Sequence, residues 1–373
     1  MQRVQIQLII KDLDKKMAFL AGPRQVGKTF IAKAVAETFH QPMYLNYDQV
    51  EDRKIIHDQA WLNTTDLLVL DELHKMPHWK NHLKGIYDTK LPSLRILVTG
   101  SARLEIFNRT GDSLAGRYFL HRLLPLSPAE LHQLQKPSSL DTLLTRGGFP
   151  EPYLSDTEVE ADRWRLQYIH SLLTTDVFDF DKIQNIGALK TIFELLRTKV
   201  GSPVSYQSLA EDVVISPSTV KKYIEILEAL YIIFRITPFS HNIARSLLKE
   251  PKIYFFDTGL VRGNDGARLE NLVAVCLLKH VYANIDYQAK EYALHYLKTK
   301  EGKEVDFALV KDQCIEKMIE VKLSDGKISP SLYAFRQKYH LPAVQLVKAL
   351  RHERLLDGIE LMTVSRFLAD LYL

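Results

Sequence analysis

Short apolar runs separated by segments with helical spacing dominate the first part of the chain. Three such runs cover residues 17–20, 67–70 and 96–98, and a more mixed run covers 42–46. A continuous apolar run is typical of a strand that is buried on both faces of a parallel sheet. Residues 30–36 carry apolar side chains three or four positions apart, which favours a helix after the first strand. The pattern predicts an α/β fold with a parallel sheet.

The first apolar run leads into a loop that is bounded by glycines. Residues 22–29 match the pattern G-x-x-x-x-G-K-[ST], so the expected nucleotide-binding residues are Gly22, Pro23, Arg24, Gln25, Val26, Gly27, Lys28 and Thr29. Two glycines let the backbone N–H groups point at phosphates, and the N-terminus of the next helix adds a positive field. Lys28 is expected to reach the β- and γ-phosphates and Thr29 to hold Mg²⁺. ATP and Mg²⁺ are therefore the predicted cofactors.

The run at residues 67–70 ends in two acids, Asp71 and Glu72. Ligands of open α/β sheets bind at the carboxyl ends of the strands, which is where these side chains are expected. An acidic pair after a strand is often only a solvated strand end, but the phosphate-binding loop upstream favours a Walker B motif. We expect Asp71 to support Mg²⁺ and Glu72 to polarise the attacking water.

Four segments occur in an order that resembles a known family. GPRQVGKT, LLVLDE, VTGSA and SLAGRYFLHRLLPLSPAEL are similar to a family of bacterial and archaeal AAA+-type ATPases, and residues 146–152 match its GGFP signature. Its members carry a winged-helix segment and a C-terminal region that resembles restriction endonucleases. The resemblance implies three domains: an AAA+-like P-loop ATPase domain at 1–150, a helical linker and winged helix at 151–245, and a restriction-endonuclease-like domain at 246–373.

The same resemblance implies two further ATPase residues. AAA+ proteins place a polar residue, called sensor 1, between the Walker motifs, and Ser101 is the expected residue, with Thr99 second. An arginine before the following strand is often an arginine finger that acts across a subunit interface. Arg117 is the candidate, ahead of Arg103 and Arg122, and a surface or interdomain salt bridge is the alternative for it. A homo-oligomer is then expected.

The middle of the chain has the spacing of a helix-turn-helix. A short helix capped by Ser205, a turn at 215–218 and a second helix at 217–230 precede a strand at 231–236 that would form a wing. The second helix exposes Lys221 and Lys222, which suit phosphate contacts but offer little base recognition. DNA contact and a purely structural role both remain open.

The last third contains an acidic pattern on two expected strands. Asp306 precedes Glu320 and Lys322 in a D-x(13)-E-x-K arrangement that resembles the PD-(D/E)xK nuclease core, and Glu270 takes the place of the upstream acid. Glu270, Asp306 and Glu320 would hold one or two Mg²⁺ ions, and Lys322 would orient water or neutralise phosphate charge. Polar residues on a solvated strand face are the alternative, and no proline precedes Asp306.

Composition narrows the class of protein. Of the 373 residues, 46% are hydrophobic and 25% charged, which is typical of a folded globular chain, and the formal net charge of +4 permits nucleic-acid contact without requiring it. The two cysteines form no metal-binding spacing, and no run is long enough to span a membrane. The sequence predicts a cytoplasmic Mg-dependent ATPase, without a membrane partner, whose cycle controls a nuclease-like domain acting on DNA or another nucleic acid. The alternative is an ATP-gated DNA-binding or signalling module with an inert nuclease-like fold.

Overall fold

The computed structural model describes residues 3–100, 114–174, 177, 183, 185–240, 249–299, 301–324 and 327–373. The chain forms two units, of which the first comprises Met1–Leu124 with Ala229–Tyr231 and the second Pro125–Glu228 with Ile232–Leu373. In the described part of the chain, no helix is both long and apolar enough to cross a lipid bilayer. The three-domain division at residues 150 and 245 stays a prediction.

Five parallel strands form the sheet of the first unit. Its elements are α1 (Gln5–Leu13), β1 (Met17–Ala21), α2 (Lys28–Ala36), β2 (Pro42–Asn46), α3 (Val50–Asp58), β3 (Leu67–Asp71), the 3-10 helix η1 (Leu73–Lys75), α4 (Trp79–Thr89), β4 (Arg95–Gly100) and β5 (Tyr118–Arg122). The strand order is β2-β3-β4-β1-β5, and each neighbouring pair runs parallel. The predicted α/β fold with a parallel sheet is confirmed.

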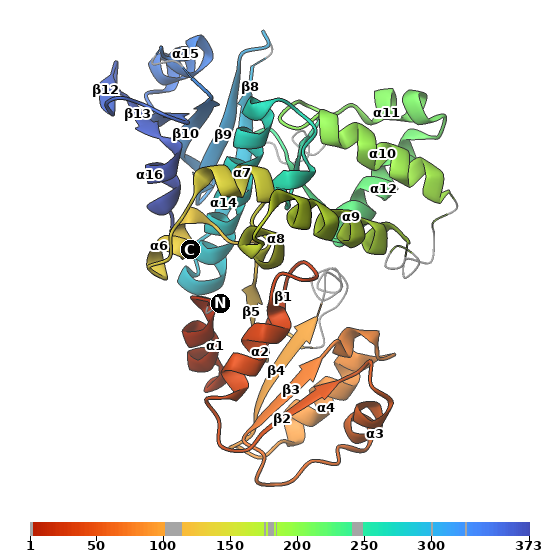
Figure 1. Ribbon diagram of the computed structural model, residues 1–373. Coiled ribbons are helices and arrows are strands. Elements are labelled where there is room, and N and C mark those ends of the chain that lie inside the picture. The colour runs from red at the N-terminus through yellow and green to blue at the C-terminus, as the bar shows by residue number, and fades with distance from the viewer. Residues whose placement is uncertain are drawn as a thin grey trace. The chain divides into compact units, whose positions relative to one another are not determined.

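Helices cover both faces of this sheet, as Figure 1 shows. One face buries Phe19, Leu68 and Leu70 in a cluster with Trp79 and Leu83 of α4. The central strands β1 and β3 are buried at every position, which is why their sequences are apolar without alternation. Burial of each such side chain contributes about 1.5–3 kcal/mol, so the sheet is a rigid base for the loops at its edge.

A mixed sheet forms the core of the second unit's C-terminal part. Its strands are β8 (Tyr292–Lys298), β9 (Glu304–Lys311), β10 (Cys314–Lys322), β11 (Ala343–Val347), β12 (Arg354–Leu356) and β13 (Ile359–Thr363), in the order β12-β13-β11-β10-β9-β8. Strands β8, β9 and β10 pair antiparallel, and β11 runs parallel to β10. The helices of this part are α14 (Asp265–Gln288), α15 (Pro330–Tyr339) and α16 (Val364–Ala369), and α15 packs Leu332 and Phe335 into the same core as Met318.

The rest of the second unit is mainly helical. It contains α6 (Pro128–Gln133), α7 (Leu140–Arg146), α8 (Pro150–Leu154), α9 (Glu158–Thr174), α10 (Ile186–Thr198), α11 (Tyr206–Val213) and α12 (Pro217–Ala229), followed by β6 (Ile233–Ile236), β7 (Lys252–Phe255) and the 3-10 helix η4 (Thr258–Leu260). Strand β7 pairs antiparallel with β6. The sequence assigned these two strands to different domains, and the expected boundary at residue 245 falls between two paired strands.

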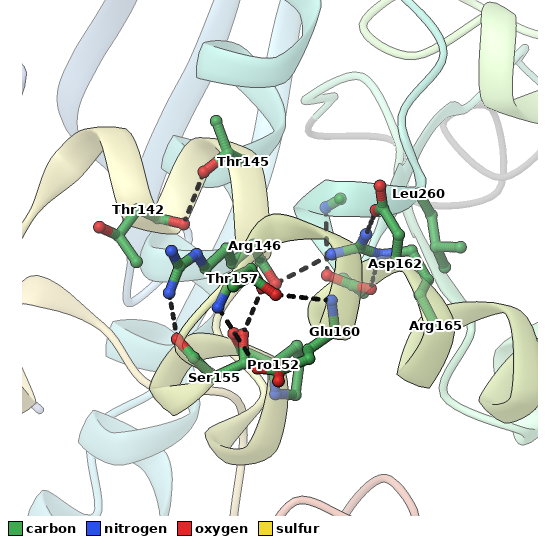
Figure 2. A network of polar contacts seen from close by, with 12 residues as sticks. Thr142, Thr145, Arg146, Pro152, Ser155, Thr157, Glu160, Asp162, Arg165 and Leu260 are labelled. Atoms are coloured by element: carbon green, nitrogen blue, oxygen red, sulfur yellow. Dashed lines mark hydrogen bonds and ion pairs between the residues drawn. The ribbon is translucent and has the colours of Figure 1, made fainter.

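A buried arginine ties the GGFP region to the end of β7. Arg165 of α9 donates from Nε to Asp257 Oδ2 at 2.8 Å, from Nη1 to Asp162 Oδ1 at 2.6 Å and from Nη2 to the Arg146 carbonyl at 2.9 Å; Figure 2 shows Arg165 with Asp162 and Arg146. Gly147 has φ 75°, and a Cβ there would lie 1.9 Å from Asp257 Oδ1. The glycine of this motif is therefore required by packing.

Candidate functional site

The loop between β1 and α2 has the conformation that its glycines permit. Gly27, which precedes α2, is left-handed at φ 103°, and Gln25 also has a positive φ of 59°. Gly22 has φ 153°, and a Cβ on it would lie 2.1 Å from the Leu123 carbonyl oxygen. A side chain at Gly22 would therefore collide with backbone, which explains the first glycine of the motif.

Lys28 lies buried against the loop that it follows. Its Nζ donates to the carbonyl oxygens of Gly22 at 3.0 Å and Pro23 at 2.6 Å. Burial lowers the pKa of Lys28 to about 8, and Arg24 adds to this effect, while the carboxylates of Glu72 and Asp71 oppose it. An anionic ligand at the loop would stabilise the charged ammonium, so the position suits a phosphate.

Three hydroxyl groups surround the Asp71 carboxylate at the end of β3. The Thr29 hydroxyl donates to Oδ2 at 3.3 Å, the Tyr44 hydroxyl donates to the same oxygen, and the Thr99 hydroxyl donates to Oδ1. Asp71 and Thr99 are register partners on neighbouring strands, which places both at the carboxyl edge of the sheet. A carboxylate beside a hydroxyl is a donor set that fits Mg²⁺.

Sequence reasoning missed Tyr44, which lies on β2 two residues before its end. Burial raises the pKa of the Tyr44 hydroxyl, and its hydrogen bond to Asp71 raises it further. The phenol therefore stays protonated and acts as a donor to the carboxylate. The local signal for this role was the position of Tyr44 near the end of the expected strand that precedes the Walker B strand in the sequence.

Glu72 leaves the strand in a left-handed conformation. Its φ and ψ are 56° and 24°, and its N–H donates to the Thr99 carbonyl at 3.1 Å. Its Oε2 lies 3.5 Å from Lys75 Nζ and 3.7 Å from His74 Nε2. This backbone conformation is uncommon for a residue other than glycine, and it turns Glu72 away from the path of the strand. Its role with water stays a prediction.

A second missed residue supports the phosphate-binding loop from the N-terminal segment. Arg3 is buried, and its guanidinium donates from Nη1 to the Val26 carbonyl at 3.1 Å and from Nη2 to the Leu124 carbonyl at 2.7 Å. It thereby joins the loop to the chain that follows β5. An isolated arginine near the N-terminus carries no motif, so the sequence offered no signal for this role.

Arg117 lies at the other end of the strands from the phosphate-binding loop. It directly precedes β5, its carbonyl accepts from Met17 N at the start of β1, and its Nε is 2.9 Å from Asp88 Oδ1. Five strand residues of about 3.3 Å each separate it from the loop of its own chain. The expected alternative, a salt bridge, is present; an action on a neighbouring subunit stays a prediction. Ser101 and Arg103 lie outside the described residues.

Acidic side chains of the second unit gather around a lysine that the sequence analysis did not single out. Lys252 of β7 is 1% exposed, and its Nζ lies 2.8 Å from Glu304 Oε1, 3.5 Å from Glu270 Oε1 and 3.6 Å from Asp306 Oδ1. Tyr254, two positions along β7, donates its hydroxyl to Glu270 Oε1 at 2.7 Å. We call Lys252, Glu270, Glu304 and Asp306 the Lys252 cluster.

Glu270 and Asp306 of the predicted nuclease residues belong to this cluster, and Glu320 and Lys322 lie next to it. The Glu320 carboxylate accepts from Asp306 N at 3.4 Å, the Asp306 carboxylate accepts from Val321 N at 2.9 Å, and Lys322 Nζ lies 2.7 Å from Glu320 Oε1. Burial raises the pKa of both Glu270 and Glu320, and the neighbouring Asp306 raises each further. Strands β9 and β10 thus bring Asp306 and Glu320 together as the pattern predicts.

These acids do not form a recognisable metal site. Across the described ranges, no group of three His, Cys, Asp or Glu side chains is arranged to hold a metal ion. The acids predicted as ligands are instead satisfied by protein groups, with Lys252 and Tyr254 on Glu270 and Lys322 on Glu320. The residues therefore do not fit the divalent metal that the nuclease resemblance implies.

Three protein-family models match successive parts of the chain. Residues 14–132 match a model described as an AAA domain, residues 137–268 match a domain of unknown function (DUF8612), and residues 265–367 match another (DUF4143). The first match agrees with the parallel sheet and its phosphate-binding loop. The N-terminal part of the chain is therefore similar to AAA-type ATPase domains with a phosphate-binding loop, which indicates nucleotide binding.

Relatives of the chain occur in bacteria and archaea. The uncharacterized protein Rv2008c of Mycobacterium tuberculosis is 26% identical over 246 residues, which are 66% of this chain and 55% of that protein. The uncharacterized protein MJ1637 of Methanocaldococcus jannaschii is 26% identical over 325 residues, covering 76% of this chain and 65% of the relative. The chain thus spans about half the length of the mycobacterial relative.

Two solved structures are similar to parts of the chain. The Walker-type ATPase PABY2304 of Pyrococcus abyssi has a TM-score of 0.43 and 14% identity, with 69% of this chain and 93% of that chain covered. A single-residue variant of RuvB from Thermotoga maritima has a TM-score of 0.30 and 16% identity, with 62% of this chain and 87% of that chain covered.

Proposed function

We propose that this chain binds ATP together with Mg²⁺ and hydrolyses the nucleotide at the loop between β1 and α2. The observation that carries the proposal is the convergence of Lys28, Thr29 and Asp71 at one edge of the parallel sheet. The match of residues 14–132 to an AAA domain supports the same reading. A lysine, a hydroxyl and a carboxylate in this order are the parts that P-loop enzymes use.

Each residue has a distinct task in this proposal. Lys28 leaves the carbonyls of Gly22 and Pro23 and binds phosphate oxygens. Thr29 and Asp71 hold Mg²⁺, which neutralises charge on the phosphates when it is bound. Glu72 orients and polarises the attacking water. Ser101 is the expected sensor residue, and Thr99, whose hydroxyl donates to Asp71, is the second candidate.

Equilibrium binding tests the nucleotide site. Fluorescence titration with a labelled ATP analogue and Mg²⁺ should give a Kd that rises at least a hundredfold in Lys28→Ala, because the cation that binds the phosphates is removed. Lys54→Ala is the matched control, since Lys54 is an exposed lysine of α3 in a pair with Glu51. Equal affinity of Lys28→Ala and wild type would refute the assignment.

We further propose that α10, α11, α12 and the β6–β7 pair form a winged helix that binds DNA. Helix α12 follows α11 after a short turn, and Ser218 and Lys221 are exposed on its first turns. Val204 N donates to the Pro251 carbonyl at 2.9 Å, and Pro203 forms an isolated bridge with Lys252, so the segment before α11 lies beside β7.

DNA binding is tested by fluorescence anisotropy with a labelled duplex over a range of salt concentrations. Lys221→Ala should weaken binding and reduce the slope of log K against log salt by about one, because one phosphate contact is lost. Lys338→Ala on α15 is the control. An unchanged slope in Lys221→Ala would remove α12 from the interface.

A further inference from the structure

The acids that the nuclease resemblance assigns to a metal surround an ammonium group instead. Lys252 Nζ lies within 3.6 Å of carboxylate oxygens of Glu270, Glu304 and Asp306. It also lies 5.4 Å from the centre of the Tyr296 ring. The lysine is almost fully buried, so its charge is balanced by these carboxylates and hardly by water.

The charge of this lysine persists at physiological pH. Burial acts to lower the pKa of Lys252, but the carboxylates of Glu270, Asp306 and Glu304 outweigh it and raise the pKa above that of an ordinary lysine. A divalent cation bound to the same oxygens would therefore face a fixed positive charge a few ångströms away. The ammonium already supplies the positive charge that these carboxylates would otherwise share with a metal ion.

The surrounding structure holds Lys252 in this position. The Asn271 amide donates to the Phe255 carbonyl at 2.9 Å and accepts from Phe255 N at 2.8 Å, which fixes β7 against α14. Gly201 has φ 78°, and a Cβ there would lie 2.7 Å from Glu270, so the turn after α10 closes over the carboxylate. The lysine is thus part of a packed core and not a mobile surface side chain.

We propose that the Lys252 ammonium is the resident cation of this acid cluster and that it excludes a divalent metal from the C-terminal domain. The ammonium joins β7, which pairs with β6, to the sheet of β8, β9 and β10. The domain consequently does not cleave nucleic acid by metal-assisted hydrolysis. This inference is independent of the ATPase proposal.

Replacement of the lysine by a neutral side chain of similar length tests the proposal. We compare three full-length proteins: Lys252→Met, the control Lys322→Met, and a protein that keeps both lysines. All three carry Thr29→Val so that the phosphate-binding loop holds no metal. Electron paramagnetic resonance measures Mn²⁺ binding, and thermal unfolding is recorded with Mn²⁺ or with a chelator, both without nucleotide. Lys322 is the matched control because it contacts Glu320 and is partly exposed.

Lys252→Met should bind one Mn²⁺ per chain at least tenfold more tightly than the other two proteins. Its melting temperature should fall in chelator and recover in Mn²⁺, because the ion replaces the lost positive charge. A Lys252→Met protein that folds but gains no Mn²⁺ would overturn the proposal. The proposal would also be overturned if the protein that keeps Lys252 bound one Mn²⁺ per chain and lost this ion on Asp306→Asn. This second measurement decides the question even if Lys252→Met fails to fold.

Discussion

Asp71 shows how single side chains prepare the proposed nucleotide site. Its carboxylate is buried, yet both oxygens accept hydrogen bonds from hydroxyl groups on three different elements. A buried carboxylate without such donors would cost several kilocalories per mole. The hydroxyls therefore hold the carboxylate in place, as the proposed Mg²⁺ site requires, and Tyr44 is the member of this set that the motifs did not predict.

Removal of the Tyr44 hydroxyl should loosen the proposed metal ligand. We expect Tyr44→Phe to reduce ATP turnover and the apparent affinity for Mg²⁺ about tenfold, because the hydrogen bond that holds Asp71 is lost. A tenfold change corresponds to a free energy of about 1.4 kcal/mol. The measurement is the Mg²⁺ dependence of the hydrolysis rate. Tyr87→Phe on α4 is the control, and a Mg²⁺ dependence in Tyr44→Phe identical to that of wild type would contradict this positioning role.

His121 gives the first unit a defined acid sensitivity. It is fully buried on β5, and burial lowers its pKa from 6.5 to about 4. The folded protein thus binds fewer protons than the unfolded chain between these values, so stability is fully present above pH 6.5 and is lost as pH falls toward 4.

Denaturant unfolding between pH 4 and 7 measures this sensitivity. Between pH 7 and pH 4 the difference for one group is about 3 kcal/mol, since one pKa unit corresponds to about 1.4 kcal/mol and the folded state is only half protonated at pH 4. His121→Gln should flatten the dependence on pH even if it lowers the stability at pH 7. Asp12, whose pKa is raised by burial, lies with its Oδ2 3.4 Å from His121 Nε2, so both proteins are measured in an Asp12→Asn background. Equal slopes for the two proteins would contradict the assignment.

At the scale of elements, the contact between α9 and the end of β7 depends on one buried ion pair. Loss of Arg165 leaves the Asp257 carboxylate, which is 1% exposed, without its charged partner. Arg165→Leu should therefore destabilise the second unit by about 3–5 kcal/mol. Adding Asp257→Asn should restore part of this loss, because it removes the unpaired charge. Chemical denaturation of Arg165→Leu, Asp257→Asn and the double variant gives the coupling, and strictly additive effects would contradict it.

The turn between α11 and α12 contains an avoidable strain. Val214 has φ 57° and is 88% exposed, so a β-branched residue adopts a left-handed conformation without compensating burial. The left-handed conformation costs about 1–2 kcal/mol for a residue with a Cβ. Val214→Gly should raise the stability by about 1 kcal/mol in thermal unfolding, after the entropic cost of glycine is subtracted. Val214→Ala is the control, and a Val214→Gly protein no more stable than Val214→Ala would refute the strain.

Elements with a strong local pattern were predictable. The strand that ends at Asp71 has an apolar sequence without alternation because both of its faces are covered, and the structure places it inside the parallel sheet. The helix at 217–230 corresponds to α12 because its apolar positions recur with helical spacing. The pairing of β6 with β7 was not predicted, since residues far apart in the sequence decide which strands meet.

At the scale of the whole molecule, two kinds of site differ in how far sequence predicts them. The phosphate-binding loop is contiguous, so its glycines, Lys28 and Thr29 appear together in one motif. The Lys252 cluster draws on β7, α14 and β9, and a single lysine in an apolar strand looks like an ordinary strand residue. Lys252 and Tyr254 are polar at alternate positions of β7, which was the only local hint that one face of this strand meets polar partners.

ATP hydrolysis by purified full-length protein tests the central claim most directly. Wild type, Lys28→Ala and Glu72→Gln are assayed with Mg²⁺ under identical conditions, and binding of ATP is recorded in parallel. We expect steady turnover by wild type, neither binding nor turnover by Lys28→Ala, and ATP binding with at least a hundredfold lower turnover by Glu72→Gln. Turnover by Lys28→Ala at the rate of wild type would contradict the account.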